Sequence, residues 1–197
     1  MREMRPPVSL ELVGTVHGRF SEHPSDDLTN PETAAGWLRS NGFPTAKPFG
    51  EEDLADLRAL RQAIFSVLAA QTEGRAQDPA AVSELNRALQ RGHITSLAAV
   101  DPRSQHRLTV VEVGADGPEA IAHRIAADAL ALITGPLAER VRQCSAHTCG
   151  SFFLDTSRAG NRKWCSSTAC GNRARVAAHR SRHQGGGRRG ERPTDHP

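Results

Sequence analysis

Apolar residues recur every three or four positions in three stretches of the chain, which predicts three long helices. The first helix should begin with the acidic residues 51–53 and end at Gly74, because glycine commonly follows the last turn of a helix. The second should begin at Asp78-Pro79 and end near residue 92. The third should begin at Gly117-Pro118. Gly135-Pro136 should interrupt it before a short helix over residues 137–142.

Shorter elements complete the pattern. Residues 8–20 suit either a short helix or a strand. Residues 30–41 should form a helix, since Asn30 can cap it and Pro31 suits its first turn. Two stretches rich in β-branched residues flank a turn at 101–104, which predicts a β-hairpin near 94–113. Because a hairpin alone is only marginally stable, we expect it to pack against the helices.

The four cysteines all fall within one short segment, as Cys144, Cys149, Cys165 and Cys170. Two C-x4-C pairs separated by fifteen residues suit a tetrahedral metal ion, because each pair can form one knuckle. We expect one structural Zn²⁺ with a closed shell of four thiolates. Two disulfides or an iron–sulfur cluster are alternatives that use the same residues. His147, inside the first pair, is a further candidate ligand in place of a cysteine.

Charge is distributed unevenly along the chain, although the net charge is only +3. Residues 140–192 hold twelve Lys/Arg and two acidic residues, whereas residues 1–139 hold thirteen Lys/Arg and nineteen Asp/Glu. This asymmetry predicts that the basic end meets a polyanion such as nucleic acid. Two other interpretations remain open. In the first, the basic tail is only a solvated extension. In the second, the basic residues near the cysteines only balance the negative charge of a metal–thiolate centre.

Neither a membrane anchor nor an export signal is visible. No apolar run approaches the roughly 20 residues that a membrane span needs, and the first residues lack an apolar core typical of a signal peptide. We therefore expect a cytoplasmic protein with no membrane partner.

The residues around the cysteines resemble the CGNR zinc finger, named after the tetrapeptide found here at residues 170–173. The resemblance includes the run FLDTS at 153–157, the run RKWCS at 162–166 and the basic helix that follows. In the N-terminal part it includes residues 10–15, where Gly14 stands in place of the asparagine that the family tends to have. The resemblance implies a bacterial, stress-induced transcription regulator whose finger binds DNA.

The helix expected after Cys170 carries basic residues on two faces. One face joins basic residues to the apolar pair 176–177, and we expect it to lean on the metal module. The opposite face should point outward. The candidate nucleic-acid site consists of the outward residues Arg175, His179 and Arg182, the loop residues Arg162 and Lys163, and Arg173 and Arg180 on the inner face.

These observations predict a mainly α fold with one small β-hairpin, of the α+β class. We expect a helical N-terminal domain over residues 1–140, a zinc finger with its basic helix over 141–183, and a disordered basic tail over 184–197. The direct connection at Arg142–Cys144 indicates that the finger is docked on the domain, because a free linker would be longer and richer in Gly or Ser.

The motifs of metalloproteases, serine hydrolases and P-loop proteins are absent from the sequence, and four thiolates leave a zinc ion no open position. We therefore expect no enzyme but a DNA-binding transcription regulator. RNA binding is an alternative, with Trp164, Phe152 or Phe153 stacking on bases. Another is a protein-interaction ribbon with a ligand-sensing N-terminal domain. The sequence leaves a small-molecule effector and a homodimer open.

Overall fold

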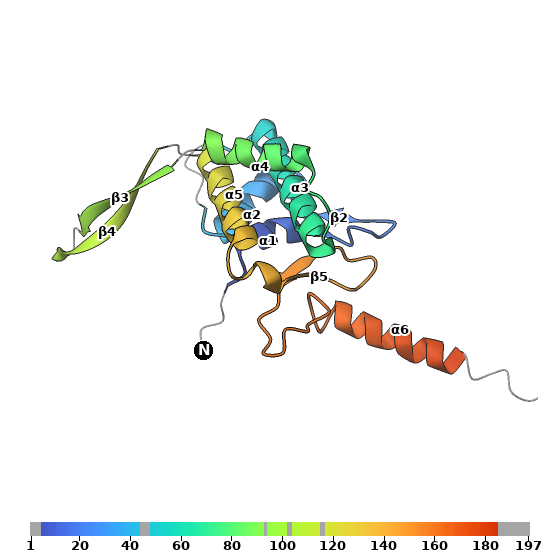
Figure 1. Cartoon of the computed structure of the whole chain (residues 1–197). Coiled ribbons are helices and arrows are strands. Elements are labelled where there is room, and N and C mark those ends of the chain that lie inside the picture. The colour runs from blue at the N-terminus through green and yellow to red at the C-terminus, as the bar shows by residue number, and fades with distance from the viewer. Residues whose placement is uncertain (1–4, 44–47, 93, 102–103, 115–116, 185–197) are drawn as a thin grey trace, which may run out of the picture.

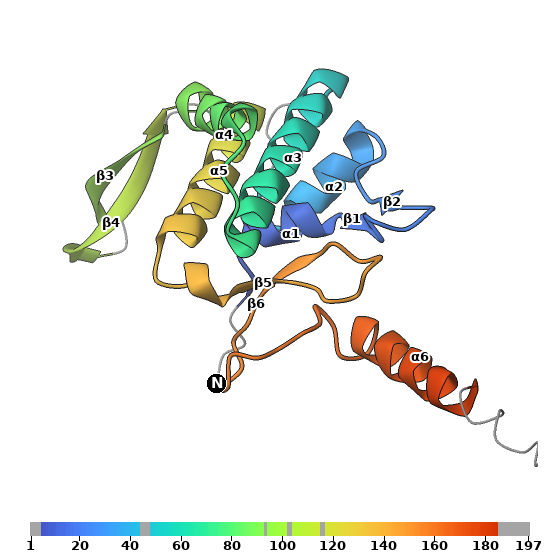
Figure 2. The same ribbon diagram turned by 45° about the vertical axis from the view of Figure 1, so that its right-hand side comes forward.

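Five helices form the N-terminal domain in the structure, a computed structural model that describes residues 5–43, 48–92, 94–101, 104–114 and 117–184. The long helix α3 contacts the other four and lies at the centre of the domain (Figures 1 and 2). Leu12, Leu38, Ile64 and Ile125 are fully buried between these helices. The five helices are α1 (Val8–Gly14), α2 (Pro31–Ser40), α3 (Glu51–Glu73), α4 (Pro79–Arg91) and α5 (Pro118–Thr134).

The helix boundaries follow from capping residues that the sequence indicates. The Asn30 side chain accepts a hydrogen bond from the Thr33 backbone N–H at 2.9 Å, and the Thr33 hydroxyl accepts one from the Asn30 N–H at 3.1 Å. Gly74 ends α3 with a φ of +64°, in the left-handed region that glycine tolerates. The Asp78 carboxylate accepts a hydrogen bond from the Ala80 N–H at 2.9 Å and caps α4. None of the helices within the described ranges is both long and apolar enough to cross a membrane.

The predicted β-hairpin is present at the expected residues, but it does not pack where we expected. It consists of β3 (Ile94–Asp101) and β4 (Ser104–Gly114), which pair antiparallel. The expectation that it packs on the helices is wrong, since it extends away from them in both views (Figures 1 and 2). At its root α4 meets α5 directly, and a Cβ on Gly92 would lie 2.0 Å from the carbonyl oxygen of Glu119. Because this close contact already closes the core, the hairpin projects as an insertion between the two helices.

Two further segments differ from or refine the predicted elements. Residues 8–20 begin with α1 and continue into β1 (Val16–His17), which pairs with β2 (Ser25–Asp26). The short helix expected over 137–142 is wrong, because only Ala138–Arg140 form a single 3-10 turn.

After this turn the chain continues as β5 (Val141–Gln143), antiparallel to β6 (Phe152–Leu154). Val141 and Phe152 are buried in the core of the helical domain, so extended pairing gives their backbone groups partners while burying both side chains. The C-terminal module is therefore docked on the helices through this ribbon.

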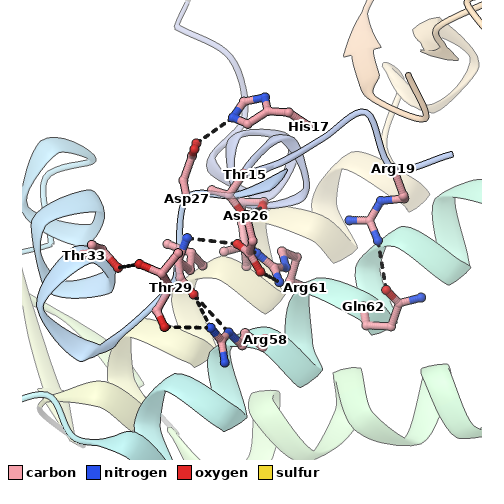
Figure 3. A network of polar contacts seen from close by, with 12 residues as sticks. Thr15, His17, Arg19, Asp26, Asp27, Thr29, Thr33, Arg58, Arg61 and Gln62 are labelled. Atoms are coloured by element: carbon pink, nitrogen blue, oxygen red, sulfur yellow. Dashed lines mark hydrogen bonds and ion pairs between the residues drawn. The ribbon is translucent and has the colours of Figure 1, made fainter. Parts of the chain in front are cut away.

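A buried arginine joins the β1–β2 segment to α3 (Figure 3). Arg61 is 7% exposed and donates to both carboxylate oxygens of Asp26 at 2.6 Å and to the Thr15 hydroxyl at 2.8 Å. Asp26 also accepts a hydrogen bond from the Leu28 N–H at 2.9 Å. Arg58, one turn earlier on α3, donates to the carbonyl oxygens of Leu28 and Thr29. The segment between α1 and α2 is thus held to α3 by two arginines.

Candidate metal centre and nucleic-acid interface

The four cysteine sulfurs gather at one point, with all of their Sγ atoms within 4.8 Å of one another. The Sγ of Cys165 lies 3.7 Å from that of Cys149 and 3.7 Å from that of Cys170. Four sulfurs held tetrahedrally at about 2.3 Å from one zinc ion lie about 3.8 Å apart. A disulfide needs a separation of about 2.05 Å, so the observed spacing fits a single metal ion and excludes two disulfides. His147 is exposed on the first knuckle and lies outside this group.

Backbone hydrogen bonds fold each cysteine pair into a knuckle. In the first, the Cys144 N–H donates to the Ser151 carbonyl at 2.8 Å, and the Cys149 N–H donates to the Ala146 carbonyl at 2.9 Å. In the second, the Gly171 N–H donates to the Ser166 carbonyl at 2.9 Å. A bond of 2.8 Å from the Ser145 N–H to the Lys163 carbonyl joins the two knuckles. The loop between the pairs therefore returns the second knuckle to the first.

The thiols of the cluster do not shift alike. Burial raises the pKa of the Cys144 and Cys165 thiols. At Cys149 burial is outweighed by hydrogen bonds with Ser151, which lower the pKa to about 7. A bound cation would stabilise all four as neighbouring thiolates. Arg173 donates to the Cys170 Sγ at 3.2 Å, and the Ser151 hydroxyl lies 3.2 Å from the Cys149 Sγ. Such second-layer contacts orient thiolate ligands and offset their charge. Four thiolates fill the tetrahedron and leave zinc a structural role.

The loop between the knuckles is organised by a buried carboxylate. Asp155 is 1% exposed and accepts hydrogen bonds from the backbone N–H groups of Ser157 and Arg162, each at 2.9 Å. Its own N–H donates to the Arg140 carbonyl at 2.8 Å, and Arg140 donates to the Ser157 carbonyl at 3.1 Å. The family motif around 153–157 contains Asp155, but neither spacing nor charge pointed to its role here as the centre of a loop.

Arg162, which we counted among the nucleic-acid contacts, has its guanidinium engaged within the finger. It donates to the Trp164 carbonyl at 2.8 Å and to the Cys165 carbonyl, and it lies 4.6 Å from the centre of the Phe153 ring. These contacts fix the backbone that carries a metal ligand.

We predict that Arg162→Ala weakens zinc binding by about tenfold, the lower end of the range for residues that support metal ligands. Arg162→Lys should recover part of the loss, since lysine keeps the charge but not the forked geometry. Competition with a chromophoric zinc chelator measures the affinity. Exposed Lys163 supplies the matched control. Its backbone carbonyl accepts the hydrogen bond from the Ser145 N–H, which an alanine retains, so Lys163→Ala should bind zinc normally. Equal affinities for both alanine variants would contradict this assignment.

The basic helix α6 (Cys170–Gln184) begins at a metal ligand. The expectation that its apolar pair leans on the metal module is wrong, because Val176 is 41% exposed and Ala177 is exposed. Only the first turn reaches the centre, through Cys170, Gly171 and Arg173, since a straight helix that starts at the metal leads away from it. Figures 1 and 2 show α6 extending from the body of the protein.

The remaining predicted contact residues lie on or beside this helix. Arg175, His179 and Arg180 are exposed, and Arg175 donates to the Ser167 carbonyl at 3.2 Å. Arg182 lies on the last part of α6, where the structure describes the backbone only. The arginines of the predicted tail, beyond residue 184, lie outside the described residues.

Two family models match the chain, one for each part. ABATE, described as a putative stress-induced transcription regulator, matches residues 7–136, and the CGNR zinc finger matches residues 140–183. No curated protein matches the chain. The matches confirm the resemblance carried by the residues around the cysteines, and the sulfur geometry agrees with one structural Zn²⁺. The chain belongs to the ABATE family of putative stress-induced transcription regulators and carries a CGNR zinc finger.

Proposed function

We propose that this chain is a bacterial, cytoplasmic transcription regulator that binds DNA through its zinc finger. The observation that carries the proposal is α6, a helix of 15 residues that starts at a zinc ligand and extends away from the body. Its sequence contains four arginines and two histidines and no acidic residue. A helix of this charge can enter the major groove or follow phosphates, whose negative charge arginine neutralises.

The metal centre supports this function by holding the first turn of the helix. Zinc would fix Cys170, and hydrogen bonds from the Gly171 N–H to the Ser166 carbonyl and from Arg175 to the Ser167 carbonyl join the start of α6 to the second knuckle. The proposed contact residues are therefore those beyond that turn, Arg175, His179, Arg180 and Arg182, together with Lys163 on the loop. Arg173 and Arg162 contribute by supporting the finger. With its coordination shell closed, the zinc has no position for a substrate, and we propose no catalytic role.

The decisive experiment compares the DNA binding of a double variant on α6 with that of a control variant in the helical domain. Arg175→Ala with Arg182→Ala should weaken DNA binding and lower the slope of log K against log salt by about 1.8, or about 0.9 for each lost phosphate contact. Arg75→Ala removes an exposed arginine of the helical domain and should change neither quantity. An unchanged affinity and slope in the double variant would show that α6 does not contact DNA.

RNA binding is less well supported than DNA binding. Stacking on unpaired bases needs accessible aromatic faces, whereas Phe152 and Phe153 are 5% and 7% exposed and Trp164 packs against the cysteine cluster. Competition between duplex DNA and single-stranded RNA at one stated salt concentration separates the two functions. A protein-interaction ribbon would instead show no nucleic-acid affinity that depends on salt.

The helical domain is the part that would receive a signal. A pocket between α3, α4 and α5 has Leu57, Leu60 and Ile121 in its lining, and Arg87 at its edge bridges acidic groups of α3 and α4. The lining also contains the charged residues Asp53, Arg91 and Glu119. An effector bound there would therefore need polar as well as apolar contacts. Pairing of two chains is a further part of the proposal, because regulators that read symmetric sites bind as dimers. The mass of the protein in solution tests it.

A further inference from the structure

The loop between β1 and β2, which belongs to the helical domain, forms backbone hydrogen bonds with the first zinc knuckle. The Arg19 N–H donates to the carbonyl of Cys149 at 3.1 Å, and the Phe20 N–H donates to the carbonyl of Thr148 at 3.1 Å. Cys149 is itself a metal ligand, so this loop is bonded to the residue that positions one of the four sulfurs. The two parts of the chain matched by different family models therefore meet at the metal centre.

The knuckle is shaped to receive this loop. Gly150 follows Cys149 with a φ of +71°, a conformation that other residues rarely adopt. A Cβ at Gly150 would lie 2.9 Å from the Cβ of Arg19 and 3.1 Å from Cε2 of Phe20. Any larger residue would therefore strain the knuckle and push the loop away, which indicates a fitted contact.

Side chains extend the contact into the helical domain. The Phe20 ring packs edge-on against Phe65 of α3 at 6.2 Å, and Phe65 packs in the same way against Phe152 of β6 at 5.5 Å. The Arg19 guanidinium lies 4.1 Å from the centre of the Phe65 ring and donates to Gln62 at 3.0 Å. Phe20 is nevertheless 55% exposed, and its ring lies beside Gly150 of the knuckle and Phe65 of α3.

The base of the loop is fixed by the network in Figure 3. Asp26, at the end of the loop, is held by Arg61 of α3, and the Asp27 N–H donates to the Thr15 carbonyl at 2.9 Å. Arg19 and Gln62 lie at the other side of the same group of residues (Figure 3). The loop is therefore anchored in α3 at its base and in the zinc knuckle at its tip.

We propose that Arg19 and Phe20 are positioning residues of the metal centre, and that through them zinc binding and the stability of the helical domain are coupled. The loop holds the first knuckle in the form that zinc requires, and bound zinc in turn fixes the loop on α3. Thermodynamic linkage makes this coupling reciprocal: a change that loosens the loop weakens zinc binding, and removal of zinc loosens the helical domain. The coupling is independent of what α6 binds.

The first test measures zinc affinity of the full chain by competition with a chromophoric chelator, without nucleic acid. Phe20→Ala should bind zinc about tenfold more weakly, in line with other residues that support metal ligands. Phe20→Tyr should restore the affinity, since it keeps the ring and its hydroxyl can reach solvent from so exposed a position. Val82→Ala, which shortens another exposed apolar residue far along the chain on α4, should bind as the natural chain does.

Two results would overturn the proposal. One is a Phe20→Ala variant with the affinity of the natural chain. The other is a loss in Val82→Ala as large as that in Phe20→Ala, which would indicate general destabilisation. Circular dichroism of the zinc-loaded variants shows in each case whether the helices are formed.

The second test uses the two tryptophans, one in each part of the protein. Trp37 packs on the helical core and Trp164 packs on the cysteine cluster. In a Trp164→Phe chain, the fluorescence of Trp37 reports thermal unfolding of the helical domain alone. Chelation of zinc should lower this transition, and adding Phe20→Ala should shrink that effect to less than half. A Trp37 transition that zinc does not move, or moves equally in both chains, would show that the two parts are uncoupled.

Discussion

Replacing Cys165 by serine should abolish stoichiometric zinc binding and unfold the finger while the helical domain stays folded. Cys165 is the ligand whose sulfur lies 3.7 Å from two others, and it anchors the second knuckle. Structural zinc sites contribute roughly 10–16 kcal/mol of apparent binding free energy, and in a module this small that energy is also folding energy. Without it the buried cysteine cluster has too little apolar surface to stay assembled.

Elemental analysis should find about one zinc per natural chain and almost none in Cys165→Ser. Loss of helical circular dichroism should be limited to a portion that matches α6, because α1 to α5 themselves supply most of the core that packs them together. Ser167→Ala, in the same knuckle, retains the carbonyl that Arg175 contacts and should keep its zinc. A zinc-free Cys165→Ser protein with α6 and the Trp164 environment intact would refute a structural role for the metal.

Breaking the Arg61–Asp26 pair should cost the helical domain roughly 3 kcal/mol when the carboxylate is removed, because the guanidinium is then left buried without its partner. Arg61 is 7% exposed, and the Thr15 hydroxyl alone cannot replace two charged acceptor atoms. Arg61→Met should cost less than Asp26→Ala. A methionine fills the buried volume without charge, and the Asp26 side chain, which is 31% exposed, can bind water.

Urea unfolding at neutral pH, followed by circular dichroism, gives these free energies. Asp27→Ala is the matched control, since the Asp27 contact to His17 is largely exposed and should contribute less than about 1 kcal/mol. If Asp26→Ala unfolds at the urea concentration of the natural chain, the pair does not stabilise the domain.

The effect of Asp26 should also depend on pH. Burial alone would raise the pKa of Asp26, but the hydrogen bonds from Arg61 and Leu28 and the charge of Arg61 outweigh it and hold the pKa below its usual value. A carboxylate of this kind contributes stability that is present above its unfolded-state pKa of about 3.9 and is lost as pH falls through the lower folded-state value. The difference between the natural chain and Asp26→Ala should therefore shrink at acidic pH.

The elements set by local chemistry could be read from the sequence. Capping by Asn30, the helix start at Asp78-Pro79, the stop at Gly74 and the apolar stripe of α3 depend on neighbours within a few residues, and all appear as predicted. The metal ligands could be named for the same reason, because cysteine spacing reflects the size of a knuckle.

Features that depend on distant partners could not be read. Arg61 and Asp26 are 35 residues apart, and nothing in either neighbourhood marks them as a pair. Strand β5 forms because β6 returns to it after the first knuckle, whereas its own residues also suit the helix that we expected. The positions of the β3–β4 hairpin and of α6 depend on which surfaces the packed helices leave uncovered. The pattern of apolar residues along the chain does not contain this information.

Helix α6 is attached to the finger at its N-terminal end, so a small rotation there moves its far end by a larger distance. A helix of 15 residues is about 22 Å long, and the contacts that join it to the finger at Cys170, Gly171 and Arg175 lie at its N-terminal end. A rotation of roughly ten degrees at that end displaces the far end by about 4 Å, which is more than the length of a hydrogen bond, about 3 Å. Changes at the knuckle that are too small to alter the fold of either domain are thus large enough, at the far end of α6, to make or break a phosphate contact.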